Sequence, residues 1–120
     1  MIGFVSPEMR PLLRLTISGG IDQEVECWLD TGFDGGLLLP EATVLALRLE
    51  TGSMVTAFLA DGSSVETQSY RGYVEWDGQK RRVQVVVANG PPLVGLHLLH
   101  EHEIRIELTE GGAVTIEPLV

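Results

Sequence analysis

The tripeptide Asp30-Thr31-Gly32 directly follows an apolar stretch, residues 25–29, that is typical of a buried strand. A carboxylate buried alone at the end of such a strand costs several kcal/mol, unless its pKa shifts until the group becomes neutral. Such a group normally has a partner. Because the 120-residue chain contains no second Asp-Thr-Gly or Asp-Ser-Gly, the simplest partner for Asp30 is a second copy of the same chain.

The charge balance excludes several kinds of partner. Eight Lys and Arg against seventeen Asp and Glu give a net charge of −9, whereas nucleic-acid binding needs clustered basic residues. The one basic cluster, Lys80-Arg81-Arg82, follows a turn signal and is interpreted as a solvated hairpin arm. The sequence therefore predicts no nucleic-acid partner and no membrane partner, since acidic proteins are repelled by anionic membranes.

The remaining bulk features indicate a cytoplasmic protein. No stretch approaches the ~20 apolar residues that a membrane span requires, and residues 1–10 lack the pattern of a signal peptide. Cys27 is the only cysteine, so an intrachain disulfide is impossible. It lies inside a strand pattern, where a small buried apolar residue is the simplest interpretation.

Short strands separated by turn dipeptides are the dominant pattern. Apolar and polar residues alternate over residues 13–17, Gly19-Gly20 breaks the run, and residues 21–29 alternate again, which predicts a hairpin that ends at Asp30. The dipeptides Asp61-Gly62 and Asp77-Gly78 predict two further hairpins. Helix is scarce: Pro40 is suited to open a helix over residues 41–47, and residues 95–102 could form a second. The sequence predicts a single all-β domain with one or two short helices.

Two segments give the tripeptide its context. Residues 33–40 read Phe-Asp-Gly-Gly-Leu-Leu-Leu-Pro, and residues 92–99 read Pro-Leu-Val-Gly-Leu-His-Leu-Leu. This combination resembles the retropepsin-like aspartic proteases, and most closely the small prokaryotic members with Asp-Thr-Gly-Phe at the catalytic turn, often called clan AA. The resemblance covers nearly the whole chain. It implies a closed retropepsin-like (acid protease) β-barrel domain over residues 1–120.

The resemblance also implies an activity. In this family two chains pair so that two Asp30 carboxylates would face each other, share a proton and activate a water molecule to cleave a peptide bond. The chain is therefore expected to be an aspartic endopeptidase that acts as a homodimer on an extended peptide or protein substrate. Thr31 would brace the facing loop of the partner, and Gly32 would leave space beside the carboxylate. No metal, no cofactor and no covalent intermediate is expected.

Further site residues are implied by position. Substrate-binding roles fall to Asp34 and to the tip of a flap hairpin, namely Ala60, Asp61, Gly62 and Ser63. Supporting roles fall to Gly95, which would brace the catalytic loop from below, to Arg10 as a possible partner of Asp34, and to His97, which replaces a second expected arginine. The flap tip has a single glycine and is expected to be stiffer than glycine-rich retroviral flaps. Residues 114–119 and the N-terminal residues would form the dimer sheet.

Other interpretations remain open at this stage. Asp30 could end a strand in an ordinary turn, and a catalytically silent dimerisation or peptide-binding module could have the same fold, since fold does not determine function. A protease that acts only on itself or on one partner is a third possibility. His97 and His100 are one helical turn apart, but His102 lies off that face, and no cysteine or well-placed carboxylate completes a recognised metal-ligand spacing.

Overall fold

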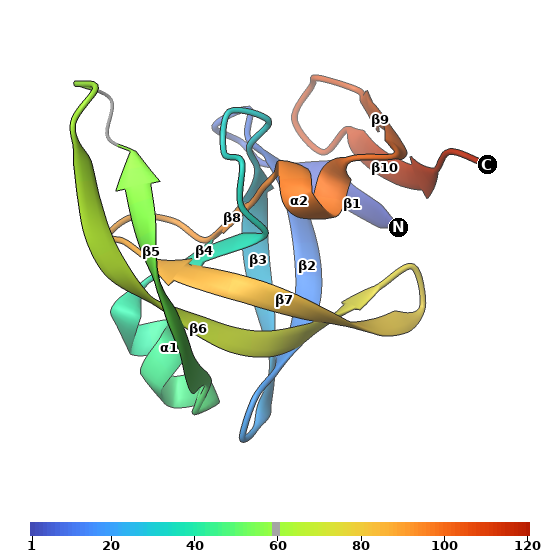
Figure 1. Ribbon diagram of the computed structural model, residues 1–120. Helices are drawn as coiled ribbons and strands as arrows, with labels where there is room; N and C mark the ends of the chain where they lie inside the picture. The colour runs from blue at the N-terminus through green and yellow to red at the C-terminus, as the bar shows by residue number, and fades with distance from the viewer. Residues whose placement is uncertain (59–60) are drawn as a thin grey trace.

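A computed structural model describes residues 1–58 and 61–120 (Figure 1). The described residues form ten strands and two short helices in the order β1 (Ile2–Val5), β2 (Pro11–Ser18), β3 (Asp22–Leu29), β4 (Leu37–Leu39), α1 (Glu41–Leu47), β5 (Glu50–Phe58), β6 (Ser64–Trp76), β7 (Gln79–Val87), β8 (Leu93–Val94), α2 (Leu96–Leu99), β9 (His102–Ile106) and β10 (Ala113–Pro118). No helix among these residues is long and apolar enough to cross a membrane.

Six of the described strands form a ring around the core, in the order β6-β7-β4-β8-β3-β2. The ring closes where β2 pairs again with β6, through Ile17 opposite Val74 and Ser18 opposite Tyr73. Because only these two residue pairs close it, the sheet is ring-like and not the closed barrel that the sequence predicted. The all-β prediction with short helices is confirmed.

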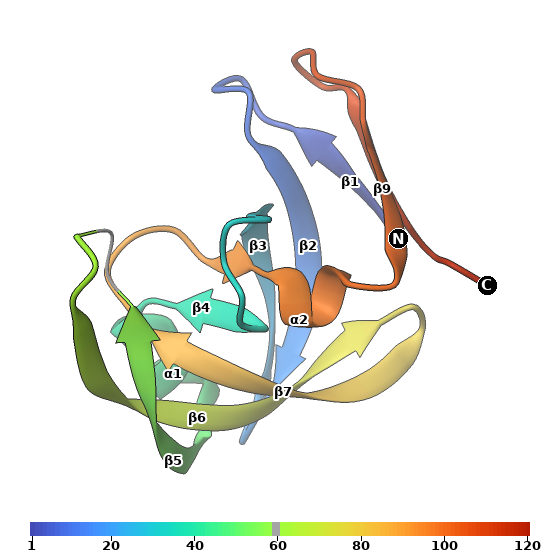
Figure 2. The same cartoon turned by 45° about the horizontal axis from the view of Figure 1, so that its top comes forward.

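The two ends of the chain form a smaller sheet beside the ring (Figure 2). The strand β1 pairs with β2 on one edge and with β10 on the other, and β9 lies on the far side of β10. Both edges of β10 are therefore paired within one chain. The expectation that residues 114–119 and the N-terminal residues form the dimer sheet stays a prediction; within one chain these segments form a sheet whose outer strand is β9.

The local sequence explains the elements that position the site. The β2–β3 hairpin pairs Ser18 with Asp22, next to the Gly19-Gly20 turn. At the β6–β7 turn, Asp77 and Gly78 both have positive φ, 53° and 75°, as a type I′ hairpin turn requires. The helix α1 spans the predicted residues. The helix α2 is shorter than predicted because His100 has an extended backbone, with φ −60° and ψ 153°, and β9 begins soon after it.

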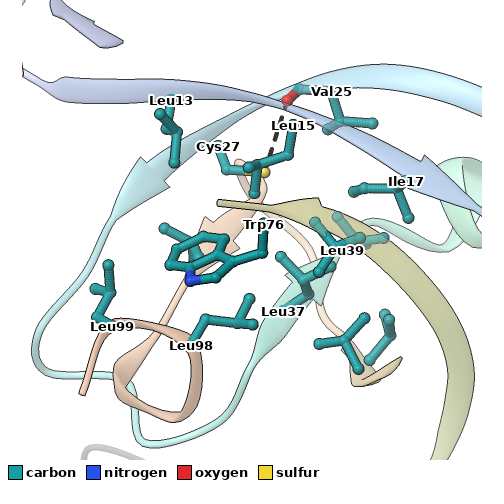
Figure 3. Packing of buried hydrophobic residues seen from close by; sticks show 14 of the residues in the cluster. Leu13, Leu15, Ile17, Val25, Cys27, Leu37, Leu39, Trp76, Leu98 and Leu99 are labelled. Carbon is teal, nitrogen blue, oxygen red and sulfur yellow. Dashed lines mark hydrogen bonds between the residues drawn. The ribbon is translucent and has the colours of Figure 1, made fainter. Parts of the chain in front are cut away.

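The core fills the ring with aliphatic side chains from both of its halves (Figure 3). The residues on β2 alternate as predicted: Leu13, Leu15 and Ile17 are buried, whereas Arg14 is exposed. The ring strands and α2 contribute further buried side chains, among them Val25, Cys27, Leu37, Leu39, Trp76, Val85, Val94, Leu98 and Leu99. Burial of this apolar surface holds the ends of β3 and β8 together, and Asp30 follows directly after β3.

Candidate active site

Asp30 is the first residue beyond β3, and the neighbouring strand β8 fixes its backbone. The two strands run parallel, with Trp28 opposite Leu93 and Leu29 opposite Val94. The Asp30 amide then donates a hydrogen bond to the carbonyl oxygen of Val94 at 2.9 Å. The carboxylate is thereby delivered at one end of the ring, next to the segment that follows β8.

The Asp30 side chain is partly exposed in the single chain. Its Oδ1 atom accepts a hydrogen bond from the Gly32 amide at 2.8 Å, and its carbonyl oxygen accepts one from the Phe33 amide at 3.2 Å. These bonds turn the backbone sharply and orient the carboxylate. The expectation that β3 delivers a buried charge is therefore wrong for one chain, because the loop lies at the surface.

The loop after Asp30 is held from below by the segment that follows β8. Gly95 donates its amide hydrogen to the Gly36 carbonyl oxygen at 2.9 Å, Leu96 to Phe33 at 2.8 Å, and His97 to Gly35 at 3.2 Å. A Cβ atom on Gly95 would lie 2.4 Å from the Gly35 carbonyl oxygen, closer than real Cβ atoms approach. Only glycine fits there without displacement of the loop. Gly95 thus packs against the loop that follows Asp30.

The role of Phe33 in this contact was not predicted from the sequence. The Phe33 ring lies between two glycines: a Cβ on Gly35 would lie 2.6 Å from its Cζ atom, and one on Gly95 would lie 2.5 Å from its Cδ2 atom. The Gly35-Gly36 pair was the available signal, since paired glycines often mark close approach of backbone to another group. The aromatic ring and the three glycines together fix the loop that carries Asp30.

Arg10 and Asp34 do not pair in the structure. The Arg10 guanidinium lies over the Trp28 ring, with 4.8 Å from Cζ to the ring centroid. Asp34 is exposed, and among the described residues no ion pair joins it to an arginine. Trp28, and not the possible partner Asp34, thus contacts the Arg10 guanidinium, because a flat indole beside the start of β2 offers a cation–π contact.

His97 contacts its neighbours mainly through its backbone, whereas its ring is exposed. Its carbonyl oxygen accepts a hydrogen bond from Arg81 Nη2 at 3.2 Å, and its exposed ring lies 5.9 Å from that of His100. His102 points elsewhere: its Nε2 atom lies 2.8 Å from Asp77 Oδ2. In the described part of the chain, no three His, Cys, Asp or Glu side chains come together as a metal ion would require.

The candidate flap is the hairpin of β5 and β6. Its strands pair up to Phe58 opposite Ser64, so the connection is longer than a two-residue turn. Asp61 Oδ1 accepts hydrogen bonds from the Ser63 amide at 2.9 Å and the Ser63 hydroxyl at 2.5 Å, while Gly62 has φ +87°. Ala60, the first of the predicted flap residues, lies outside the described residues. The tip and the Asp30 loop lie on the same side of the molecule (Figures 1 and 2).

The hydrogen bonds from Ser63 change the chemistry of the flap tip. The hydroxyl, and then the amide, stabilise the charged form of Asp61 and lower the pKa of this fully exposed carboxyl. Beneath the Asp30 loop the opposite effect applies to Cys27, where burial raises the pKa of the thiol to about 12. Cys27 is therefore an uncharged core residue.

Comparison with solved structures identifies the class to which this arrangement belongs. EIAV protease in complex with the inhibitor HBY-793 is 26% identical, with a TM-score of 0.57 over 78% of this chain and 88% of that one. A retropepsin-like aspartic protease from Rickettsia conorii is 12% identical, with a TM-score of 0.64 over 95% of this chain and 87% of that one. No protein-family model and no curated protein matches the sequence.

The fold of this chain is thus similar to that of EIAV protease and to that of a retropepsin-like aspartic protease from Rickettsia conorii. The chain is retropepsin-like, as its sequence predicted. Chemically, one chain presents the Asp30 carboxylate, oriented by the Gly32 amide, on a surface loop that is held by backbone hydrogen bonds and by close glycine packing.

Proposed function

We propose that the chain is an aspartic endopeptidase that acts as a homodimer, with one Asp30 from each chain. The position of the Asp30 carboxylate carries this proposal: it is oriented by Gly32 and partly exposed at the end of the ring. The only Asp-Thr-Gly of the chain supplies half of a two-carboxylate site. A second copy, related by a two-fold axis, supplies the other half by symmetry.

The paired carboxylates would catalyse hydrolysis without a covalent intermediate. Two carboxyl groups in contact cannot both ionise comfortably, so they hold one proton between them; this behaviour is carried over from the aspartic proteases as a class. The ionised Asp30 takes a proton from a bound water as the water oxygen attacks the substrate carbonyl carbon. The protonated Asp30 donates a hydrogen bond to the carbonyl oxygen. A proton then passes to the amide nitrogen as the carbon–nitrogen bond breaks.

The substrate in this proposal is an extended peptide that lies between the Asp30 loops and the two flaps. An extended strand supplies main-chain hydrogen bonds, and its side chains point alternately to opposite sides. Asp34 and the flap-tip residues from 60 to 63 would contact the substrate backbone, and Thr31 would brace the partner's loop. These assignments rest on the resemblance and on the surface positions of Asp34 and of residues 61–63.

Digestion of a peptide library tests the proposal. The expected result is cleavage by the unmodified protein and by Asp22→Asn, a control that changes an exposed carboxylate at the other end of β3. Asp30→Asn should abolish cleavage while sedimentation still shows the dimer. Asn keeps the shape of the side chain but cannot act as a general base.

Two other outcomes would count against the proposal. Tight binding of extended peptides without cleavage, from acidic to neutral pH, would indicate the catalytically silent peptide-binding module. The flap tip, which has Gly62 as its single glycine, is the observation that favours this second candidate. A monomer at micromolar concentration would contradict both candidates, because a single Asp30 cannot form the pair.

A further inference from the structure

Five of the eight basic residues of this acidic chain line three cavities whose walls do not include Asp30. We define the arginine pocket as the cavity of about 210 Å³ whose charged lining is Arg48, Arg71, Arg82 and Glu50. Gly19, Gly20, Gly72 and Tyr73 complete its wall. A positive cluster in a chain of net charge −9 is unexpected, since free lysines and arginines would normally be dispersed among the carboxylates.

Three different elements deliver the three guanidinium groups. Arg48 caps the C-terminal end of α1 in the left-handed conformation, with φ 55° and ψ 49°, and its carbonyl oxygen accepts a hydrogen bond from Gly20 at 3.2 Å. Arg71 lies on β6, and Arg82 lies on β7 directly opposite Tyr73. Between them Gly72 and Val83 are buried and face each other, so the alternation along both strands turns Arg71 and Arg82 outward.

The positive charge of the pocket is not balanced from within. The carboxylate of Glu50 lies 3.6 Å from Arg71 Nη2, and both side chains are largely exposed. Within the described part of the chain, no carboxylate lies within ion-pair distance of Arg48 or Arg82. Three guanidinium groups around one cavity therefore share one carboxylate, and their mutual repulsion is relieved when an anion enters.

The volume of the arginine pocket and the geometry of its guanidinium groups indicate which class of anion it can bind. Pockets for drug-sized ligands occupy roughly 300–1,000 Å³, so a cavity of about 210 Å³ suits a small group. A phosphoryl group carries close to two negative charges and three strong acceptor oxygens. The planar fork of a guanidinium matches such oxygens with two parallel hydrogen bonds. A carboxylate offers one charge and two oxygens, which is a poorer match to three arginines.

We propose that the arginine pocket binds a phosphoryl group, presented either as inorganic phosphate or as a small phosphomonoester. Arg48, Arg71 and Arg82 donate hydrogen bonds to its oxygens, and Glu50 competes with it for Arg71. The site is separate from Asp30: β3 starts beside the pocket wall and ends one residue before Asp30, so its eight residues place the two sites about 25 Å apart. In Figure 1 the end of α1 and the β2–β3 turn lie at the lower end of the molecule.

Isothermal titration calorimetry with inorganic phosphate and, separately, with O-phosphoserine tests this proposal. Ionic strength is held constant with chloride, and acetate serves as the carboxylate control. Arg82→Gln and Arg48→Gln should each weaken phosphate binding about tenfold, since each removes a charge-assisted hydrogen bond. Arg105→Gln, which removes an exposed charge on β9 outside the pocket, should leave the affinity unchanged.

A gain of affinity provides the sharper readout. Glu50→Gln removes the competing carboxylate and should tighten phosphate binding several-fold, an effect that damage to the fold would not produce. Binding of inorganic phosphate and O-phosphoserine with similar affinity indicates recognition of the phosphoryl group itself, and tighter binding of O-phosphoserine identifies a phosphomonoester as the ligand. Equal affinity for acetate, equal losses in Arg105→Gln and Arg82→Gln, or no measurable binding would overturn the proposal.

Discussion

The amide nitrogen of Gly95 donates a hydrogen bond to the carbonyl oxygen of Gly36 at 2.9 Å, and this bond joins the segment after β8 to the foot of the Asp30 loop. The two residues belong to distant parts of the sequence. Their approach leaves no room for a side chain, because the Gly35 carbonyl and the Phe33 ring occupy the space beside Gly95. The position of Asp30 is therefore set by packing as well as by its own strand.

Gly95→Ala should destabilise the protein by about 3 kcal/mol, because an added methyl group overlaps backbone atoms that cannot move independently. Urea denaturation measures the loss, and amide NMR shifts of Gly32 and Gly36 should report displacement of the loop. Gly78→Ala is the control: its Cβ meets no atom within 4 Å, so only the backbone strain of a positive φ is added. Equal losses and unchanged amide shifts would contradict this account.

Cys27 should be inert to alkylation in the folded protein. Its side chain is fully buried, and burial raises the pKa of the thiol to about 12 from an ordinary value of 9.0. Labelling with iodoacetamide at pH 8 should therefore require unfolding and should follow the denaturant transition. Because the pKa of the Cys27 thiol is higher in the folded than in the unfolded state, its contribution to the free energy of unfolding is fully present below pH 9. This contribution is lost as the pH rises from 9 toward 12. Rapid labelling without denaturant would show an accessible thiolate.

The Asp61 carboxyl should titrate below the usual range for aspartate, because the Ser63 hydroxyl and amide both donate to it. Carbon-detected NMR of the flap tip measures this pKa directly. Ser63→Ala removes the hydroxyl donor and leaves the amide, so the pKa should rise part of the way to its ordinary value. Because the pKa of Asp61 is lower in the folded than in the unfolded state, its ionised form stabilises the fold at pH values above the unfolded-state pKa. This contribution to the free energy of unfolding is lost as the pH falls through the folded-state pKa. An unchanged pKa in Ser63→Ala would contradict the assignment.

His102 should be the histidine on which stability depends. Its Nε2 atom lies 3.1 Å from the indole nitrogen of buried Trp76 and 2.8 Å from Asp77 Oδ2. His102→Leu leaves the indole N–H without a partner and should cost about 1–3 kcal/mol, whereas His102→Gln retains an acceptor and should cost less. Trp fluorescence during urea denaturation measures both. His100→Leu, at an exposed ring, should have little effect; equal losses at both positions would refute the distinction.

Sequence patterns predicted those elements whose cause is local. Two glycines after an alternating run predicted the β2–β3 hairpin, and Pro40 predicted the start of α1. The turn at Asp77-Gly78 followed from the residues that a type I′ turn requires. These features depend on neighbouring residues along the chain, so the local sequence contains the necessary information.

Features that depend on competition between distant groups were not predictable in this way. Arg10 could pair with a carboxylate or stack on an aromatic ring, and the structure has it over Trp28. The packing of Phe33 against Gly95 likewise depends on how two segments meet. The pairing of β10 with both β1 and β9 depends on which strand edges are left after the ring closes. The patterns predicted the hairpins β2–β3, β5–β6 and β6–β7, but not the short strands β1, β4 and β8 or the pairing of strands that are distant in the sequence.

Because β10 is paired on both edges within one chain, we expect a single chain to fold before it forms a dimer. Within one chain β10 pairs with β1 on one edge and with β9 on the other, so the terminal sheet forms from residues of a single chain. Under the proposed homodimer, dilution would then yield folded single chains, each holding one Asp30. Activity would rise and fall with the concentration of the protein, while the temperature at which each chain unfolds in the dilute state would not depend on concentration.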